Sequence, residues 1–314
     1  MAKTILSFYL DDTSPYDAPA AAFKTFLDFV SVEGIAGESS VILGYQWDAH
    51  GLLSYPTTAN QEAYIEQLQR AYTCGVDSHF ELMTHAGLYD IDQALIPPGA
   101  IHEGLWMHEP AISVVQYEHY LEHIISDAAR IGVHFTGLTQ PGCGCEACVQ
   151  RFHELRQEGV TEPNPNLWQA LLNLAQKGRF RRPTVPVFIG NGGDQCAARL
   201  LAGEGDHGVY YLPPNLGDHF GLWLNDPRYV DADYYINARG DSGRIIDVVR
   251  AGAPYCIFFT HWQGFNPANG VGWGAFTQVV RRVQRFLKDQ VVWMRPSDYT
   301  DHLHQSANTH HPAT

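Results

Sequence analysis

The stretch Ile5-Leu-Ser-Phe-Tyr-Leu-Asp-Asp-Thr-Ser-Pro15 decides the fold class of this chain. It is an apolar run that ends in two adjacent carboxylates and a turn. A buried parallel strand has a continuous apolar sequence, and the loops after such strands carry the chemistry of α/β folds. Because consecutive strand residues point to opposite sides, we expect Asp11 and Asp12 to have different roles. The same residues also fit a solvated turn in which an aspartate caps the next helix.

Apolar runs typical of strands alternate along the chain with amphipathic segments typical of helices. The expected strands are 4–10, 41–47, 76–84, 133–139, 185–190, 209–212, 233–236, 255–260 and 291–294. The expected helices are 18–32, 60–74, 112–131, 146–158, 166–177, 241–252 and 274–288. This α/β alternation, with no break in composition, predicts a single parallel (β/α) barrel over residues 1–304 and a polar tail over 305–314. An open doubly wound sheet gives the same alternation.

Composition narrows the list of partners and compartments. The 314 residues include 20 Lys and Arg against 34 Asp and Glu, a formal net charge of -14 that disfavours nucleic acid and anionic membranes. No apolar run has the length of a membrane span, and the first residues do not resemble a signal peptide, so we expect a cytoplasmic protein. In that reducing compartment the six cysteines are expected to be thiols or metal ligands.

Reactive side chains fall at the carboxyl ends of the expected strands. Asp11 and Asp12 follow the first strand, His85 follows the third, and His261 follows the strand at 255–260. In a parallel barrel these ends share one face, and the active site is built there. Imidazole and carboxylate groups on one face are what a metal-dependent hydrolase needs, together with a base and an acid.

Four motifs in this chain resemble those of the polysaccharide deacetylase family, the metal-dependent carbohydrate esterases. They are Phe8-Tyr-Leu-Asp-Asp-Thr13, Glu81-Leu-Met-Thr-His85, Thr139-Gln-Pro-Gly142 and Phe258-Phe-Thr-His261. The resemblance covers most of the chain and implies a distorted seven-stranded (β/α) barrel. It implies that Asp11 is the catalytic base, that Asp12 and His85 bind a divalent metal, and that His261 is the general acid. The metal it implies is zinc, with cobalt, manganese and nickel as alternatives.

The chain departs from the family pattern at two places. The arginine that usually lies near the proline of the third motif is absent, and Tyr89 stands where the family has its second metal histidine. Asp90 is the expected third ligand, with His102 and His108 as alternatives. His79 is excluded, because it precedes His85 by six residues and lies roughly 20 Å from it along a strand.

The resemblance also implies a saccharide substrate, whose rings would stack on aromatic side chains. The expected substrate-binding residues are Trp47, Tyr89, Trp106, Pro141, Trp262 and Trp273. Each tryptophan alone is more often a core residue than part of a sugar site. The oligomeric state stays open.

Cys143, Cys145 and Cys148 lie close together directly after the third motif, with His153 downstream. They form a structural zinc site if a fourth ligand completes the tetrahedron, and are reduced thiols otherwise. Two further functions fit the chain. One is a glycoside hydrolase that uses paired carboxylates, and the other is a carbohydrate-binding relative without catalysis.

Overall fold

The computed structural model describes residues 3–14, 20–44, 59–142, 146–189, 197–218, 220, 227–268 and 270–310. The strands are β1 (Thr4–Thr13), β2 (Gly37–Val41), β3 (Val76–Phe80), β4 (Gly137–Thr139), β5 (Thr184–Phe188), β6 (Arg199–Glu204), β7 (His207–Tyr211), β8 (Leu216–Asp218), β9 (Tyr255–His261) and β10 (Val291–Trp293). The helices are α1 (Ala20–Glu33), α2 (Ala59–Ala71), α3 (Glu103–Trp106), α4 (Val114–Arg130), α5 (Glu146–Gln157), α6 (Pro165–Gln176), α7 (Ala232–Tyr235), α8 (Arg244–Arg250), α9 (Trp262–Phe265), α10 (Gly272–Phe286) and α11 (Pro296–His310).

The strands form one 10-stranded sheet in the order β6-β7-β5-β4-β3-β2-β1-β9-β8, with β10 paired to β1. Every pairing is parallel except that of β6 with β7. Within the described residues β6 and β8 are the two ends of this path, and no pairing joins them. The expected α/β fold with a mainly parallel sheet is therefore confirmed, whereas a closed seven-stranded barrel is not what these strands form.

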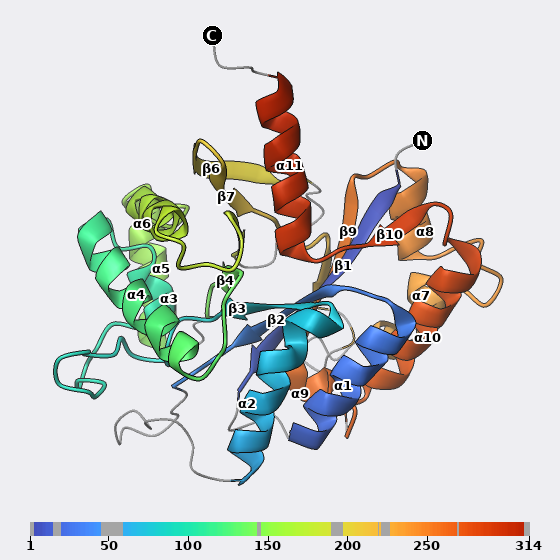
Figure 1. Cartoon of the computed structure of the whole chain (residues 1–314), viewed down its shortest axis with the longest axis horizontal. Helices are drawn as coiled ribbons and strands as arrows, with labels where there is room; N and C mark the ends of the chain where they lie inside the picture. Colours follow the sequence, from blue (N-terminus) through green and yellow to red (C-terminus); the bar gives the residue numbers. More distant parts are fainter. Residues whose placement is uncertain are drawn as a thin grey trace.

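Helices cover the outer face of the curled sheet. In Figure 1, α1, α2 and α10 lie below and to the right of the strands, α4, α5 and α6 lie to their left, and α11 projects beyond the strands. Strand β1 lies between β2 and β9, and its side chains alternate between two cores. Leu6, Phe8 and Leu10 pack toward the helices, whereas Ile5 and Tyr9 pack inside the curl of the sheet. Asp11 continues this inward-facing series, since it follows Tyr9 by two residues.

Several elements differ from those expected. β2 begins and ends earlier than the apolar run expected as a strand at 41–47. Its sequence is Gly-Glu-Ser-Ser-Val, which is mostly polar, so an apolar pattern did not reveal it. Residues 233–235 of the segment expected as a strand belong to the short helix α7, and Ile236 is its C-cap. Helix α11 continues to His310, through most of the segment predicted as a tail.

No helix in the described part of the chain is both long enough and apolar enough to cross a bilayer.

Candidate metal centre

At the end of β1, the carboxylates of Asp11 and Asp12 both point toward His261. Asp12 has a φ of 61°, in the left-handed region, and the pairing of β1 with β2 shifts register between Leu10 and Thr13. This irregularity breaks the strand alternation, so Asp11 and Asp12 do not point apart as we expected from sequence. Nε2 of His261 lies 3.8 Å from Oδ2 of Asp11 and 3.9 Å from Oδ2 of Asp12. Backbone strain of this kind is concentrated at functional sites.

The chain leaves β3 through a second strained segment. β3 ends at Phe80, and both Leu82 and His85 have positive φ values, 53° and 54°. The turn is held by the buried carboxylate of Glu103, which accepts hydrogen bonds from the backbone N–H groups of Met83, Thr84 and His85 at 3.1, 2.9 and 2.8 Å. Glu103 thereby holds the stretch of backbone from which the His85 side chain projects.

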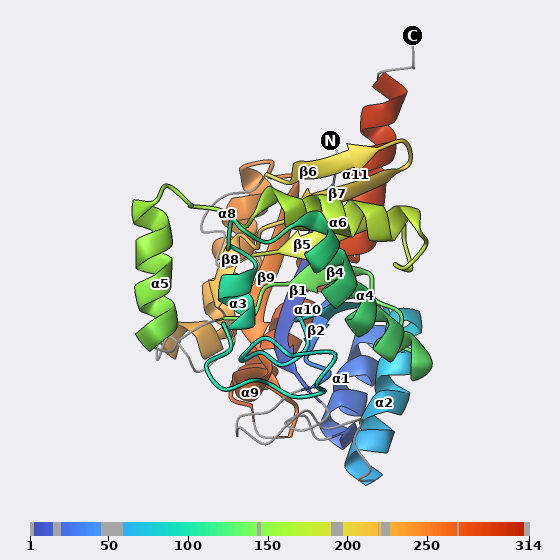
Figure 2. The same ribbon diagram turned by 90° about the vertical axis from the view of Figure 1, so that its left-hand side faces the viewer.

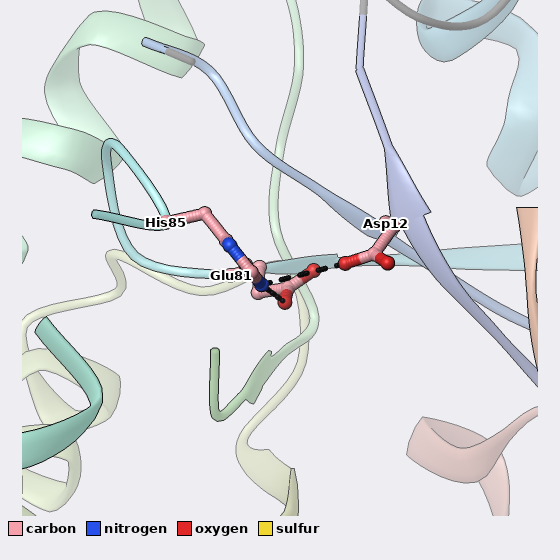
Figure 3. Close-up of side chains that lie close together, drawn as sticks. All are labelled: Asp12, Glu81 and His85. Carbon is pink, nitrogen blue, oxygen red and sulfur yellow. Dashed lines mark ion pairs between the residues drawn. The ribbon is translucent and has the colours of Figure 1, made fainter. Parts of the chain in front are cut away.

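Three side chains converge between these two segments (Figure 3). Nε2 of His85 lies 3.4 Å from Oδ1 of Asp12 and 3.1 Å from Oε1 of Glu81. One potential ligand atom from each of the three residues lies within 4.8 Å of the other two. Glu81 is fully buried, whereas the side chains of Asp12 and His85 are 15% and 17% exposed. One nitrogen and two carboxylate oxygens in a partly open site form a donor set suited to a divalent metal.

Ser40 on β2 connects this group to Asp11. Its Oγ lies 2.7 Å from Oδ1 of Asp11 and 2.7 Å from Oε2 of Glu81, and it accepts a hydrogen bond from the backbone N–H of Asp12 at 3.0 Å. A hydroxyl has one proton and can donate it to one carboxylate at a time. In the absence of a metal, one of the two carboxyl groups must therefore carry a proton of its own.

The pKa shifts identify Asp11 as that group. Burial, followed by the charges of Glu81 and Asp12, raises the pKa of Asp11 well above its usual value. Burial also raises the pKa of Glu81, but His85 and Ser40 outweigh this effect, so its pKa is lowered overall. Burial and the charge of Glu81 raise the pKa of Asp12 to about 6.

The imidazole of His85 responds to the same charges. Burial lowers the pKa of His85, but the carboxylates of Glu81 and Asp12 outweigh burial and raise it to about 9. The metal-free group therefore holds an imidazolium among carboxylates. Metal binding must displace that proton, because the ligand form of histidine is the neutral ring.

The expected third ligand, Asp90, lies outside the converging group. Its carboxylate accepts hydrogen bonds from the backbone of Asp92 and Gln93 and from the Gln93 side chain, and so closes a turn of its own loop. Glu81 occupies the place in the group that we assigned to Asp90. The signal for Glu81 was present in the sequence, since it opens the motif that ends at His85.

The two alternative ligands also lie elsewhere. His102 caps α3 by accepting a hydrogen bond from the backbone of Gly104, with its ring 6.2 Å from that of His85. His108 lies at hydrogen-bond distance, 3.1 Å, from the side chain of Gln140. Neither is among the described residues whose ligand atoms converge.

The structure does not support sugar stacking by the expected tryptophans. Trp106 and Trp262 are 3% and 1% exposed, so their faces are covered by protein. Trp273 packs against the rings of Phe26, Phe29, Phe265 and Phe276. The large apolar surface of these rings is used in the core. Trp47 lies outside the described residues.

The two other expected substrate-binding residues, Pro141 and Tyr89, also contact the rest of the protein. Pro141 is buried. The ring of Tyr89 stacks on that of His123, with centroids 6.0 Å apart. Their assignment to substrate stays a prediction.

Cys148 is disulfide-bonded, so it is neither a free thiol nor a zinc ligand as we expected. Cys143 and Cys145 lie outside the described residues. The buried Cys74 and Cys256 do not form disulfide bonds. Disulfides persist in oxidising compartments, and this bond therefore counts against the reducing environment on which the cytoplasmic prediction depends.

A second imidazole–carboxylate pair lies deeper on the same strands. Glu38 on β2 and His79 on β3 are fully buried, with Nδ1 of His79 3.7 Å from Oε2 of Glu38. Neither side chain has a hydrogen-bond partner among the described residues. His79 lies outside the converging group, as predicted.

Comparisons with known proteins give only distant likenesses. No protein-family model matches the sequence, and no curated protein matches it. Among solved structures, a T48 deacetylase with substrate is 11% identical, with 94% of this chain and 89% of that chain covered and a TM-score of 0.41. A family 4 carbohydrate esterase from Streptomyces lividans in complex with acetate is 11% identical, with 92% of each chain covered and a TM-score of 0.40.

A family 4 pseudoenzyme from Bacillus anthracis is 7% identical, with 93% of this chain and 63% of that chain covered and a TM-score of 0.38. At such identities and TM-scores the likeness does not assign chemistry to any residue. The function of the site must therefore be argued from its own geometry.

Proposed function

We propose that this chain is a divalent-metal-dependent hydrolase that removes an acetyl group from a carbohydrate. The observation that carries the proposal is the convergence of Asp12, Glu81 and His85, with Asp11 and His261 beside them. These residues come from three of the four motifs that resemble carbohydrate deacetylases, and they lie at the ends of strands far apart in the sequence.

The residues fit a divalent cation. Asp12, Glu81 and His85 would hold it, and the hydroxyl of Ser40 orients the second oxygen of Glu81, as partners of metal ligands commonly do. A mixed nitrogen and oxygen set suits zinc, with cobalt, manganese or nickel as alternatives. When bound, the cation would supply the Lewis acidity that activates water and polarises an acyl oxygen.

Asp11 is the proposed base. Burial and the charges of Glu81 and Asp12 raise its pKa well above the usual value, which makes its carboxylate a stronger base than an ordinary one. The positive charge of a bound cation would favour that ionised form over the protonated form of the metal-free site. Ser40 orients one of its oxygens, and the other faces His261.

His261 is the proposed acid that protonates the leaving group. It ends β9 directly opposite Asp11 in the register of β1 and β9. Base and acid are thus held on adjacent strands, on one side of the metal ligands. The saccharide substrate, the cytoplasmic location and the lack of nucleic-acid partners stay predictions.

Metal content measured by elemental analysis tests this proposal. We expect near-stoichiometric metal in the wild type and in Asp90→Asn, and loss of metal in Glu81→Gln and His85→Ala. Asp90→Asn is the matched control, because it alters the carboxylate first expected to be the ligand. Acetate release from an N-acetylglucosamine oligomer is expected to follow metal content across the four proteins.

Other outcomes would direct attention to the two rival functions. Metal that survives both Glu81→Gln and His85→Ala contradicts the assignment of the ligands. Hydrolysis of a glycosidic bond without metal would indicate the paired-carboxylate glycoside hydrolase, and sugar binding without any hydrolysis would indicate a non-catalytic protein.

A further inference from the structure

A large cavity lies at the ends of β4, β5 and β7. Its volume is about 1060 Å³. Its described walls come from α5, the segment around 160–163, the start of α6, and the ends of strands. In Figure 2, α5 stands at the left margin of the molecule, and β6, β7 and α6 lie together in the upper part of the view. The reaction proposed above uses none of the residues that line this cavity.

The cavity opens at the same edge of the sheet as the proposed metal centre. Gln140 follows β4 and Ile189 follows β5, and both line the cavity. β4 is the direct neighbour of β3, the strand that leads to Glu81, and β5 is the next strand. Strands lie about 4.8 Å apart, so the near wall of the cavity is about 5–10 Å from β3. A ligand of several sugar units is long enough to occupy both places.

The described lining carries more positive than negative groups, although the chain as a whole has a net charge of -14. The lining includes two guanidinium groups, those of Arg156 and Arg199, and one carboxylate, that of Glu162. Arg199 and Glu162 form an ion pair at 3.0 Å, and both side chains are more than half exposed. Such exposed pairs are weak, so Arg199 can exchange Glu162 for a ligand carboxylate at little cost.

Arg156 and His108 both line the cavity, and the charge of Arg156 acts on the His108 ring. Burial, together with the charge of Arg156, lowers the pKa of His108, and hydrogen bonding to Gln140 and to the backbone of Glu162 opposes this only in part. His108 is therefore a neutral polar group beside an arginine. Guanidinium groups bind carboxylates in a planar, two-point geometry, which makes Arg156 suitable for an acidic ligand.

Aromatic rings complete the lining. Phe152 on α5 and Tyr211 at the end of β7 are partly exposed, and the guanidinium of Arg199 lies 5.6 Å from the centre of the Tyr211 ring. Ligand sites commonly combine such apolar faces with a few polar groups that fix orientation. Rings suit the face of a pyranose, and the two arginines suit a negative substituent on it.

We infer that this cavity binds a carboxylate-bearing sugar unit, a uronic acid residue of the saccharide whose acetyl group is removed at the metal centre. The inference rests on the proposed function only in assigning the bound sugar to that substrate. Binding itself requires no metal. The recognising groups are Arg156, Arg199, Tyr211 and Phe152.

Isothermal titration calorimetry in the presence of a chelator tests the inference. The probes are a tetrasaccharide of alternating glucuronate and N-acetylglucosamine, and the neutral N-acetylglucosamine tetramer. We expect the wild type to bind the acidic probe at least about tenfold more tightly, because hydrogen bonds to charged groups are the stronger ones. Arg156→Gln and Arg199→Gln should each lose most of this preference and leave binding of the neutral probe unchanged.

Arg281→Gln is the matched control, since Arg281 is an exposed, ion-paired arginine on α10, far from the cavity. It should retain the preference. Equal affinity for the two probes in the wild type, or an equal loss in Arg281→Gln, overturns the inference. His85→Ala separates the two proposals, because it should lose metal and acetate release yet still prefer the acidic probe. Acetate release without any acidic preference would leave the proposed function standing and remove the role of the cavity.

Discussion

The protein has two imidazole–carboxylate pairs, one on β2 and β3 and the other where the chain leaves β3. The pKa values of their two histidines are shifted in opposite directions. Glu81 and His85 lie where β3 ends, 3.1 Å apart, with the His85 side chain 17% exposed. Glu38 and His79 lie deeper, 3.7 Å apart and fully buried. The pKa of His85 is raised to about 9, whereas burial lowers that of His79 to about 3.

The difference follows from whether each carboxyl group stays ionised. Glu81 is hydrogen-bonded by Ser40 and faces an imidazolium, so it remains charged in spite of its burial. Glu38 has no such partner among the described residues, and burial together with the charges of Asp77 and Glu81 raises its pKa. An ion is retained in a protein interior only where hydrogen bonds replace water. The pair at the end of the strand, Glu81 and His85, therefore has the ionised carboxylate that metal binding needs, and the deeper pair does not.

Replacement of one carboxyl group in each region should give the largest contrast. Asp11→Asn removes the proposed base and is expected to lower kcat for acetate release by about 100- to 10,000-fold, the usual contribution of general base catalysis. Its metal content should not change, since Asp11 lies outside the ligand group. Initial rates and elemental analysis on the same preparations measure both quantities.

Glu38→Gln is the control for that experiment, because Glu38 is a buried carboxyl group on the adjacent strand. Its turnover should stay close to that of the wild type. A loss as large as that of Asp11→Asn would mean that the deeper pair takes part in catalysis, and the contrast between the two regions would fail.

Neighbouring serines on β2 offer a finer contrast. Ser40 contacts Asp11 and Glu81, whereas Ser39 shares a hydrogen bond of 2.9 Å with the hydroxyl of Thr13. Ser40→Ala should weaken metal binding by about 10- to 100-fold, as the loss of a group that orients a ligand does. Ser39→Ala should cost about 1 kcal/mol of stability and leave the metal dissociation constant unchanged. Competition titration with a chelator gives that constant, and equal weakening in both variants would contradict the role of Ser40.

The sequence predicted the parts of this site that depend on strand ends. Apolar runs that stop at Asp11 and at His261 do end at the same edge of the sheet, in register with each other. The alternation of strands and helices was also predicted. Both are encoded locally, since apolar periodicity and chain breaks are short-range signals.

What the sequence did not predict depends on contacts between distant segments. The left-handed backbone at Asp12 needs the register shift against β2, and the polar strand that contains Glu38 and Ser40 has no apolar pattern. The placement of Glu81 in the group depends on the turn that Glu103 holds. The burial of Trp262 is likewise decided by tertiary packing, which residue type alone does not determine.

The smallest expected effect concerns the pH dependence of stability. In the unfolded chain, carboxyl and imidazole groups titrate near their usual values of about 4.3 and 6.5. Between these values the unfolded chain carries one proton, on His79, and the folded protein also carries one, on Glu38. Folding therefore neither takes up nor releases a proton at this pair. The pair then adds nothing to the pH dependence of the free energy of unfolding.

Single substitutions should expose two opposite slopes. Glu38→Gln leaves His79, whose folded pKa is depressed, so stability is lost as pH falls below about 6.5, by up to about 1.4 kcal/mol per pH unit. His79→Gln leaves Glu38, whose folded pKa is raised, so stability is lost as pH rises above about 4.3, at a similar slope. Urea unfolding at pH 5 and pH 6, with chelator present, measures both relative to the wild type.

The double variant Glu38→Gln with His79→Gln is the control for this measurement. It removes both titrations and should restore the slope of the wild type, even if its overall stability is lower. If the two single variants instead change slope in the same direction, one of the buried groups remains ionised in the folded protein. The deeper pair would then resemble the metal-binding pair in its charge, and burial alone would not explain why the two regions differ.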